Sequence, residues 1–211
     1  MTSLTGPLDD ATAAALRGEL IVFPTDTVYG LGTRPDDPAA TARVFEAKER
    51  SRELELPVLV PTAASARSVA VFDERAERLV AACWPGPLTL VLPRGEDALG
   101  WDLGGDPATV GVRAPHHPLA LVILAGTGPL AVTSANRSDH PPAETCDDLQ
   151  ALFGEDVAVY LCQGDRLEGV ASTVVDLAHG PATVLREGSL PVTAIAELLP
   201  EEPALDSRPS S

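Results

Sequence analysis

The chain has 211 residues, which is enough for one domain with a sizeable core. Hydrophobic residues make up 45% and charged residues 22%, a balance that argues against a wholly disordered protein. The formal net charge of −16 disfavours broad nucleic-acid binding, because an acidic surface repels phosphate backbones at long range.

The cysteines and the termini bear on where the protein acts. Cys83, Cys146 and Cys162 are widely spaced and form no metal-ligand pattern with the four histidines. Their odd number favours buried free thiols in a reducing compartment. No basic segment followed by an apolar one opens the chain, and the longest apolar run, 119–125, is too short to span a bilayer. We therefore expect a cytoplasmic protein with no membrane segment and no metal ligands of its own.

The first predicted elements are a helix and a buried strand. A helix is expected over 8–17, and Gly18 ends it. The apolar run 20–23 then predicts a buried strand, which Pro24 ends because proline cannot donate to the sheet ladder. The polar residues that follow lead to Gly30 and Gly32, which are expected to let the backbone turn tightly.

A second helix is expected over 38–50. Pro38 suits its first turn, and Lys48 and Arg50 fall at its C-terminal end, where cations interact favourably with the helix dipole. Lys48 is the single lysine among 15 basic residues, which favours a site that needs a compact ammonium. A chance lysine on a solvated helix end is the alternative.

The rest of the chain continues the alternation of strands and helices. Strands are expected over 57–60, 88–92, 109–113, 129–133, 157–161, 172–177 and 183–185, and helices over 73–83, 116–125, 146–153 and 193–199. This interleaving predicts the α/β class: a single domain over 1–199 with an open, twisted, mixed sheet and flanking helices. Residues 200–211 are polar and rich in Pro and Ser, and we expect a disordered tail there.

The candidate polar side chains lie at the ends of expected strands or in the turns that follow them. They are Thr25, Tyr29, Arg113, Ser134, Asn136 and Arg186. Open α/β sheets bind ligands at such strand ends. The set supplies cations, hydroxyls and an amide but no general base or nucleophile, which suits a reaction in which the enzyme orients ATP and stabilises departing pyrophosphate. Taken singly, each residue has a purely structural alternative, such as a turn former or a surface cation.

Five segments, in this order, resemble the YrdC-like family of threonylcarbamoyl-AMP synthases, which act in tRNA modification. These segments are 24–32, Lys48-Glu49-Arg50, 84–89, 133–136, and 172–176 with Arg186. The resemblance implies an open α/β sheet round a deep cavity. It also implies a nucleotidyltransferase that makes threonylcarbamoyl-AMP and pyrophosphate from L-threonine, bicarbonate and ATP with a divalent cation, Mg²⁺. The product would pass to a downstream threonylcarbamoyl transferase complex.

The resemblance also implies roles for the residues at matching positions. Thr25, Arg113 and Ser172 would hold threonine, with Arg113 pairing with its carboxylate. Lys48 and Arg50 would face the ATP phosphates and act as catalytic groups. The nucleotide would also contact Thr109, Ser134, Asn136 and Arg186.

The chain departs from the family pattern at the expected ATP end. The segment 48–57 is two residues longer than the family pattern and adds Glu53 and Glu55. Carboxylates beside a triphosphate raise the electrostatic cost of binding unless they face solvent or a metal ion. Pro61 replaces a residue that is usually polar, and 138–144 lacks the usual glycine and hydroxyl.

Three alternatives to the synthase remain, and the departures support the first of them. The first is a catalytically altered paralogue that binds a nucleotide or an amino acid. The second is a double-stranded RNA-binding protein, which the acidic charge disfavours. The third is a relative that forms a carbamoyl-adenylate for another acceptor.

Overall fold

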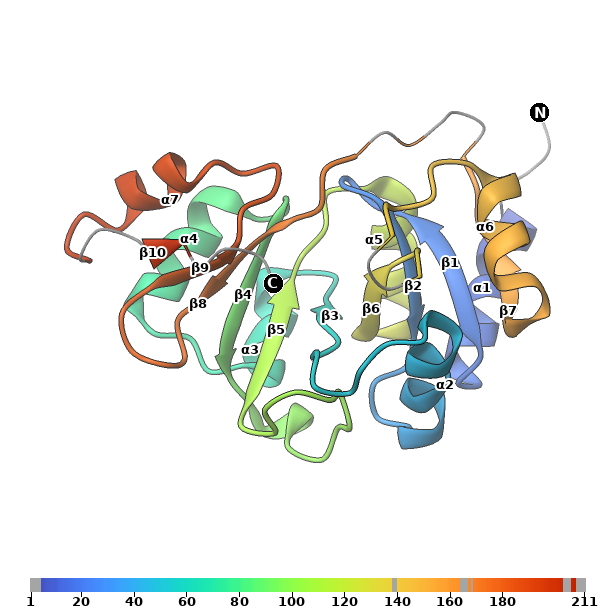
Figure 1. The fold of residues 1–211 in the computed structure, drawn as a ribbon. Helices are drawn as coiled ribbons and strands as arrows, with labels where there is room; N and C mark the ends of the chain where they lie inside the picture. Colours follow the sequence, from blue (N-terminus) through green and yellow to red (C-terminus); the bar gives the residue numbers. More distant parts are fainter. Residues whose placement is uncertain (1–4, 138–139, 164–166, 168, 203–205, 208–211) are drawn as a thin grey trace.

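A ten-stranded mixed sheet runs through the molecule, and helices pack against both of its faces (Figure 1). The computed structural model describes residues 5–137, 140–163, 167, 169–202 and 206–207. The strand order is β10-β9-β8-β4-β5-β3-β6-β2-β1-β7. The predicted α/β class with an open, mixed sheet is confirmed.

The strands are β1 (Leu20–Pro24), β2 (Tyr29–Thr33), β3 (Val58–Leu59), β4 (Leu88–Pro93), β5 (Thr109–Arg113), β6 (Leu130–Ser134), β7 (Val157–Tyr160), β8 (Thr173–Asp176), β9 (Thr183–Arg186) and β10 (Asp206–Ser207). The helices are α1 (Thr5–Leu16), α2 (Pro38–Lys48), α3 (Ala63–Val69), α4 (Glu74–Cys83), α5 (Pro118–Thr127), α6 (Cys146–Phe153) and α7 (Val192–Leu198). Short 3₁₀ turns cover Glu96–Ala98 and Gly154–Asp156.

Strand β1 separates two hydrophobic clusters. Successive side chains of a strand point to opposite faces of the sheet. Leu20 and Val22 accordingly join the larger cluster, whereas Ile21 and Phe23 join a smaller one with buried residues of α1 and α5. Because β1 is apolar on both faces, it is buried throughout its length, as its unbroken hydrophobic run predicted.

The glycines after β1 lie in a strand, which corrects the expectation of a tight turn at Gly30 and Gly32. Strand β2 pairs antiparallel with both β1 and β6, and the chain reverses earlier, over 25–28. A Cβ added at Gly30 or Gly32 would lie 2.7 or 2.8 Å from the methyl groups of Val132 on β6. These glycines therefore allow the close approach of a neighbouring side chain rather than a reversal of the backbone.

Helix α2 ends at Lys48, two positions before the predicted end at Arg50. Glu49 adopts a left-handed conformation with a φ of 53°, and its N–H donates to the carbonyl oxygens of Glu46 and Phe45. Arg50 therefore leaves the helix axis and begins the following loop. The motif Lys48-Glu49-Arg50 thus places its two cations on different elements.

Two of the three cysteines are paired, so the expectation of three free thiols is wrong. Cys146 and Cys162 form a disulfide with their Cα atoms 5.7 Å apart, and Cys83 is free. Cys146 opens α6 and Cys162 follows β7. The chain reverses between α6 and β7, and this brings together two cysteines that are 16 positions apart.

Other differences from the predicted elements are small. Helix α3 was not predicted; Thr62 and Ser65 cap its N-terminus reciprocally. Within the expected tail, Asp206–Ser207 forms β10 beside β9, whereas 203–205 and 208–211 lie outside the described residues. Among the described helices, none has the length and apolar character needed to cross a membrane.

Candidate active site

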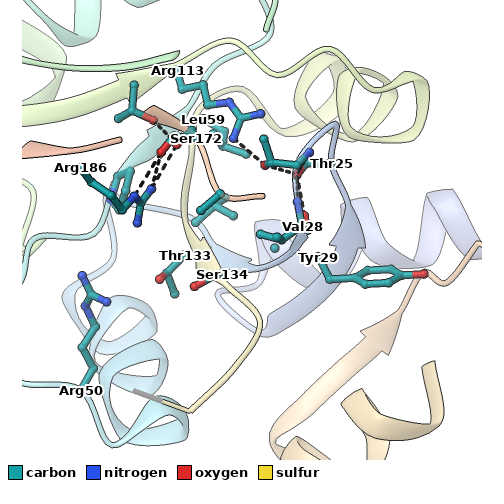
Figure 2. A pocket seen from close by; sticks show the side chains of 16 residues that line it. Thr25, Val28, Tyr29, Arg50, Leu59, Arg113, Thr133, Ser134, Ser172 and Arg186 are labelled. Carbon is teal, nitrogen blue, oxygen red and sulfur yellow. Dashed lines mark hydrogen bonds between the residues drawn. The ribbon is translucent and has the colours of Figure 1, made fainter. Parts of the chain in front are cut away.

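A pocket forms where strand ends converge (Figure 2). The turn between β1 and β2 and residues of β3, β4, β5, β6 and β9 line it. Seven of the candidate residues named from the sequence line it: Thr25, Tyr29, Arg50, Arg113, Ser134, Ser172 and Arg186. Lys48, Thr109 and Asn136 are not among the residues that line it.

Thr25 shapes the turn after β1 as well as lining the pocket. Its hydroxyl donates to the carbonyl oxygen of Val28 at 2.6 Å and accepts from the backbone N–H groups of Thr27 and Val28, both at 3.2 Å. This is the Ser/Thr turn that the sequence offered as a structural alternative. The structural role and the place in the pocket therefore belong to the same residue.

Arg113, at the end of β5, is buried and held from three directions. Its Nε donates to Gly86 O at 2.9 Å, its Nη1 to Thr27 Oγ1 at 2.9 Å and its Nη2 to Asp26 Oδ1 at 2.5 Å. Burial lowers the pKa of Arg113, and the charge of Asp26 opposes this. The guanidinium is thus a fixed cation in a low-dielectric wall of the pocket.

Sequence reasoning did not identify Asp26, Thr27 or Thr89 as site residues. Asp26 and Thr27 directly follow Thr25 in the turn, and this position was the one feature of the sequence that could have identified them as site residues. Thr89 lies on β4, and its hydroxyl is 2.9 Å from the hydroxyl of Ser172. Nothing in the local sequence pointed to that contact, because it joins residues 83 positions apart.

Ser172 supports a second cation of the pocket. Arg186, at the end of β9, donates from Nε and Nη2 to Ser172 O at 3.1 and 2.9 Å, and from Nη2 to Ser172 Oγ at 3.3 Å. The antiparallel pairing of β8 with β9 brings the two residues together. Ser172 therefore orients Arg186 in addition to lining the pocket.

Arg50 lies on the same side of the pocket as Arg186 (Figure 2). Its Nε and Nη2 donate to the carbonyl oxygens of Leu54 and Glu55, at 3.2 and 3.1 Å. Burial, and then the charge of Arg186, lower the pKa of Arg50. In the part of the chain that the structure describes, no carboxylate pairs with either arginine, whereas Arg113 has Asp26. Two neighbouring cations without a carboxylate partner form a binding place for an anion.

The extra carboxylates of the lengthened loop do not line the pocket. Glu53 is exposed, and Glu55 Oε1 lies 3.9 Å from Nη2 of the buried Arg94. Burial raises the pKa of Glu55 to about 8, although Arg94 opposes the shift. The loop contacts Arg50 through the backbone carbonyl oxygens of Leu54 and Glu55. The expected electrostatic penalty therefore does not arise directly in the pocket.

Lys48 contacts the turn at the end of β6, of which Asn136 is a part. The ammonium of Lys48 donates to Ser134 O, Asn136 O and Asn136 Oδ1. Asn136 also accepts from the Ser134 hydroxyl and donates to His140 O. Lys48 is 1% exposed. These contacts join the end of α2 to the end of β6.

Thr109 lies at the start of β5, at the opposite end of the strand from Arg113. Its hydroxyl donates weakly to Asp106 O at 3.5 Å, and its carbonyl oxygen accepts from Arg94 Nε at 2.7 Å. A five-residue strand separates its ends by about 13 Å. The structure does not bring Thr109 to the pocket.

The described residues contain no group of three or more His, Cys, Asp or Glu side chains that could hold a metal ion. Mg²⁺ in nucleotide sites is usually held by substrate phosphates together with one or two carboxylates. The residues present therefore do not form a resident magnesium site. A Mg²⁺ ion that arrives bound to ATP would belong to the substrate.

The fold and the pocket define an α/β protein with one pocket that has hydroxyl groups and a buried arginine on one side and Arg50 and Arg186 on the other. A family model for Sua5, YciO and YrdC proteins, described as "Telomere recombination", matches residues 13–188. The chain belongs to this family. The resemblance inferred from the five segments is confirmed.

Similar proteins extend the comparison. A Mycobacterium leprae relative is 42% identical over 195 residues, covering 92% of this chain and 88% of the relative. The threonylcarbamoyl-AMP synthase of Pyrococcus abyssi is 37% identical over 186 residues, covering 87% of this chain and 54% of that protein. The crystal structure of P. abyssi Sua5 complexed with L-threonine matches with a TM-score of 0.85 at 33% identity, over 96% of this chain and 59% of that chain. The chain thus spans a little over half the length of the P. abyssi protein.

Proposed function

We propose that the chain is an L-threonylcarbamoyladenylate synthase, which makes threonylcarbamoyl-AMP and pyrophosphate from L-threonine, bicarbonate and ATP for tRNA modification. The observation that carries the proposal is the asymmetry of one pocket. A buried arginine stands beside Thr25 at one side, and two arginines that pair with no carboxylate of the described residues stand at the other. The carboxylate of an amino acid would complement the buried arginine, and the phosphates of ATP would complement the two arginines at the other side.

At the threonine side, Arg113 pairs with the substrate carboxylate. Three of its five N–H groups are taken by Gly86, Thr27 and Asp26, which leaves one N–H on each terminal nitrogen. Charge-assisted bonds from a fixed guanidinium orient a carboxylate well. Thr25 and Ser172 supply the neighbouring hydroxyl oxygens.

The connectivity of the product defines the bonds that must form. The threonine nitrogen bonds to the carbon of bicarbonate with loss of water. A carbamate oxygen then bonds to the α-phosphorus of ATP while the bond to pyrophosphate breaks. No described side chain of the pocket needs to become a covalent intermediate, so the protein acts by orientation and charge stabilisation.

At the phosphate side, Arg50 and Arg186 stabilise the negative charge that grows on departing pyrophosphate. Their mutual repulsion is relieved when an anion binds between them. Ser134 lines the pocket nearby. Mg²⁺ enters with ATP as part of the substrate, while a nucleotide contact by Thr109 has no support in the geometry.

The finer predictions about partners and location rest on the family. A mixed carbamic-phosphoric anhydride is reactive, so the product would pass to a threonylcarbamoyl transferase complex. A role in tRNA modification favours the cytoplasm. The expectation of a reducing compartment rested on free thiols, and the disulfide between Cys146 and Cys162 removes that support.

The deciding experiment is pyrophosphate release from ATP in the presence of bicarbonate and Mg²⁺, with and without L-threonine. Release that depends on threonine is expected, and L-serine is the matched control for side-chain recognition. Thermal stabilisation by threonine or ATP without any release would overturn the proposal in favour of the altered paralogue. The position of Glu53 and Glu55 outside the pocket favours the enzyme.

A further inference from the structure

Lys48 closes a turn that lines the pocket. The 134–136 turn follows β6, and its three oxygen atoms converge on the Lys48 ammonium. The distances from Nζ are 2.6 Å to Ser134 O, 2.6 Å to Asn136 O and 2.9 Å to Asn136 Oδ1. On the other side, the backbone N–H of Ala135 donates to Tyr29 O at 2.8 Å. The turn is therefore held between α2 and β2.

We propose that Lys48 is a positioning residue that holds the 134–136 turn in its ligand-binding shape and does not itself contact the ATP phosphates. The proposal rests on the proposed function and revises the role that the family resemblance implied for Lys48.

All three N–H donors of the Lys48 ammonium are used within the protein. An ammonium has three N–H donors, and three acceptors at hydrogen-bond distance take them. A phosphate could bond to Nζ only by displacing one of these oxygens, which would then be buried without its partner. Lys48 is also 1% exposed and does not line the pocket, unlike Arg50 two positions later.

The chemistry of the site explains why this position carries the single lysine of the chain. Three oxygens that converge on one point match a compact ammonium better than a planar guanidinium, whose donors diverge in a fork. Burial, and then the charge of Arg50, lower the pKa of Lys48 to about 7. A neutral amine has only two N–H donors, so the turn is fully held only by the charged form.

The 134–136 turn orients the side chains at the end of β6 that line the pocket. Ser134 pairs with Gly30 of β2, and Thr133 and Ser134 both line the pocket. The Ser134 hydroxyl donates to Asn136 Oδ1 at 2.6 Å, the same oxygen that Lys48 holds. Lys48 therefore acts on the pocket through the conformation of Ser134.

The first test uses the wild-type protein. Isotope-labelled lysine gives one side-chain ammonium signal, because Lys48 is the only lysine. Magnetic resonance should detect couplings across hydrogen bonds from Lys48 Nζ to the carbonyl carbons of Ser134 and Asn136. We expect these couplings without ligand and at saturation with inorganic pyrophosphate or ATP. Their absence, or a coupling from Nζ to ligand phosphorus, would overturn the proposal.

The second test is a double-mutant cycle on the dissociation constant for ATP. Lys48→Met keeps the side-chain volume but removes the donors, and Asn136→Ala removes one acceptor. Each is expected to weaken ATP binding by about tenfold or more. The double variant should bind within about twofold of the weaker single variant, because both changes release the same turn. Multiplying effects would indicate independent contacts with ATP and would overturn the proposal.

The control cycle combines Asn136→Ala with Arg186→Met. Arg186 lies on β9 and lines the pocket itself, so these two losses should multiply. If Lys48→Met does not fold, the magnetic resonance result on the wild type decides alone.

The two proposals fail differently. A wild type that releases pyrophosphate with threonine but shows a Lys48-to-phosphorus coupling retains the synthase assignment and loses only the positioning role. A wild type that binds neither ATP nor pyrophosphate loses both.

Discussion

Arg113 carries a charge in a buried wall of the pocket, and its neighbours determine what it can bind. Asp26 and Thr27 each occupy one terminal nitrogen, and Gly86 O occupies Nε. The guanidinium cannot rotate without breaking these bonds, so the direction of its two remaining N–H donors is set by the protein. A residue that looked like an isolated strand-end cation in the sequence is therefore part of a fixed cluster.

Replacement of Arg113 by lysine tests this arrangement. Arg113→Lys keeps the charge but removes the fork, so the KM for threonine should rise by about tenfold or more while the KM for ATP changes little. Steady-state pyrophosphate release at varied threonine and at varied ATP measures both constants. Arg17→Lys is the control, because Arg17 is exposed and pairs with Glu19. A rise confined to the KM for ATP would contradict the assignment.

At the scale of elements, the segment from α6 to the residue after β7 is closed by a covalent bond. The disulfide joins Cys146 at the start of α6 to Cys162. The residue before Cys162, Leu161, donates its backbone N–H to Val22 O of β1 at 2.8 Å. The cross-link thus connects a peripheral helix to the edge of the sheet where β7 pairs with β1. Its removal should act on stability more than on the pocket.

A double variant, Cys146→Ala with Cys162→Ala, tests this expectation. Cross-linking residues 16 positions apart restricts the unfolded chain, so its loss should lower the free energy of unfolding by about 3 kcal/mol. Urea unfolding followed by circular dichroism measures the change. Cys83→Ala is the control for loss of a thiol outside the disulfide. Equal stability of the double variant and the wild type under oxidising conditions would show that the bond contributes nothing.

At the scale of the whole molecule, an acidic surface surrounds a cationic pocket. Several exposed arginines pair with carboxylates, so these arginines do not form a positively charged surface that could bind nucleic acid. These pairs are Arg17 with Glu19, Arg34 with Asp36, Arg52 with Asp102, Arg67 with Glu77 and Arg78 with Glu201. Among the described residues that line the pocket, Arg50 and Arg186 have no carboxylate partner, whereas Arg113 pairs with Asp26.

This distribution predicts no appreciable binding of double-stranded RNA. A net charge of −16 repels a phosphate backbone, and pocket arginines cannot follow a duplex. Fluorescence anisotropy of a labelled duplex, titrated with protein at low and at physiological salt, measures the affinity. ATP serves as competitor to identify any binding through the pocket. A salt-sensitive affinity that ATP does not displace would favour the RNA-binding alternative.

Local chemistry made most of the fold predictable. Runs such as 20–23 and 109–113 combine apolar and β-branched residues, and both formed strands because burial and propensity favour the same structure. The glycine-rich stretch 29–33 was misread, because glycine has no side chain from which a strand period can be recognised. Strand β2 pairs with β1 and with β6, and Val132 of β6, far away in the sequence, packs against its glycines.

The fold class, the family and seven of the residues that meet in the pocket could be predicted from the sequence, because strand periodicity and the order of motifs are properties of the chain. The fold was needed to show that Cys146 meets Cys162 and that Glu55 lies beside Arg94. It was also needed to show that Lys48 faces the 134–136 turn while Arg50 faces the pocket. The physical reason is that each of these contacts depends on distances between segments far apart in the chain, which local sequence does not encode.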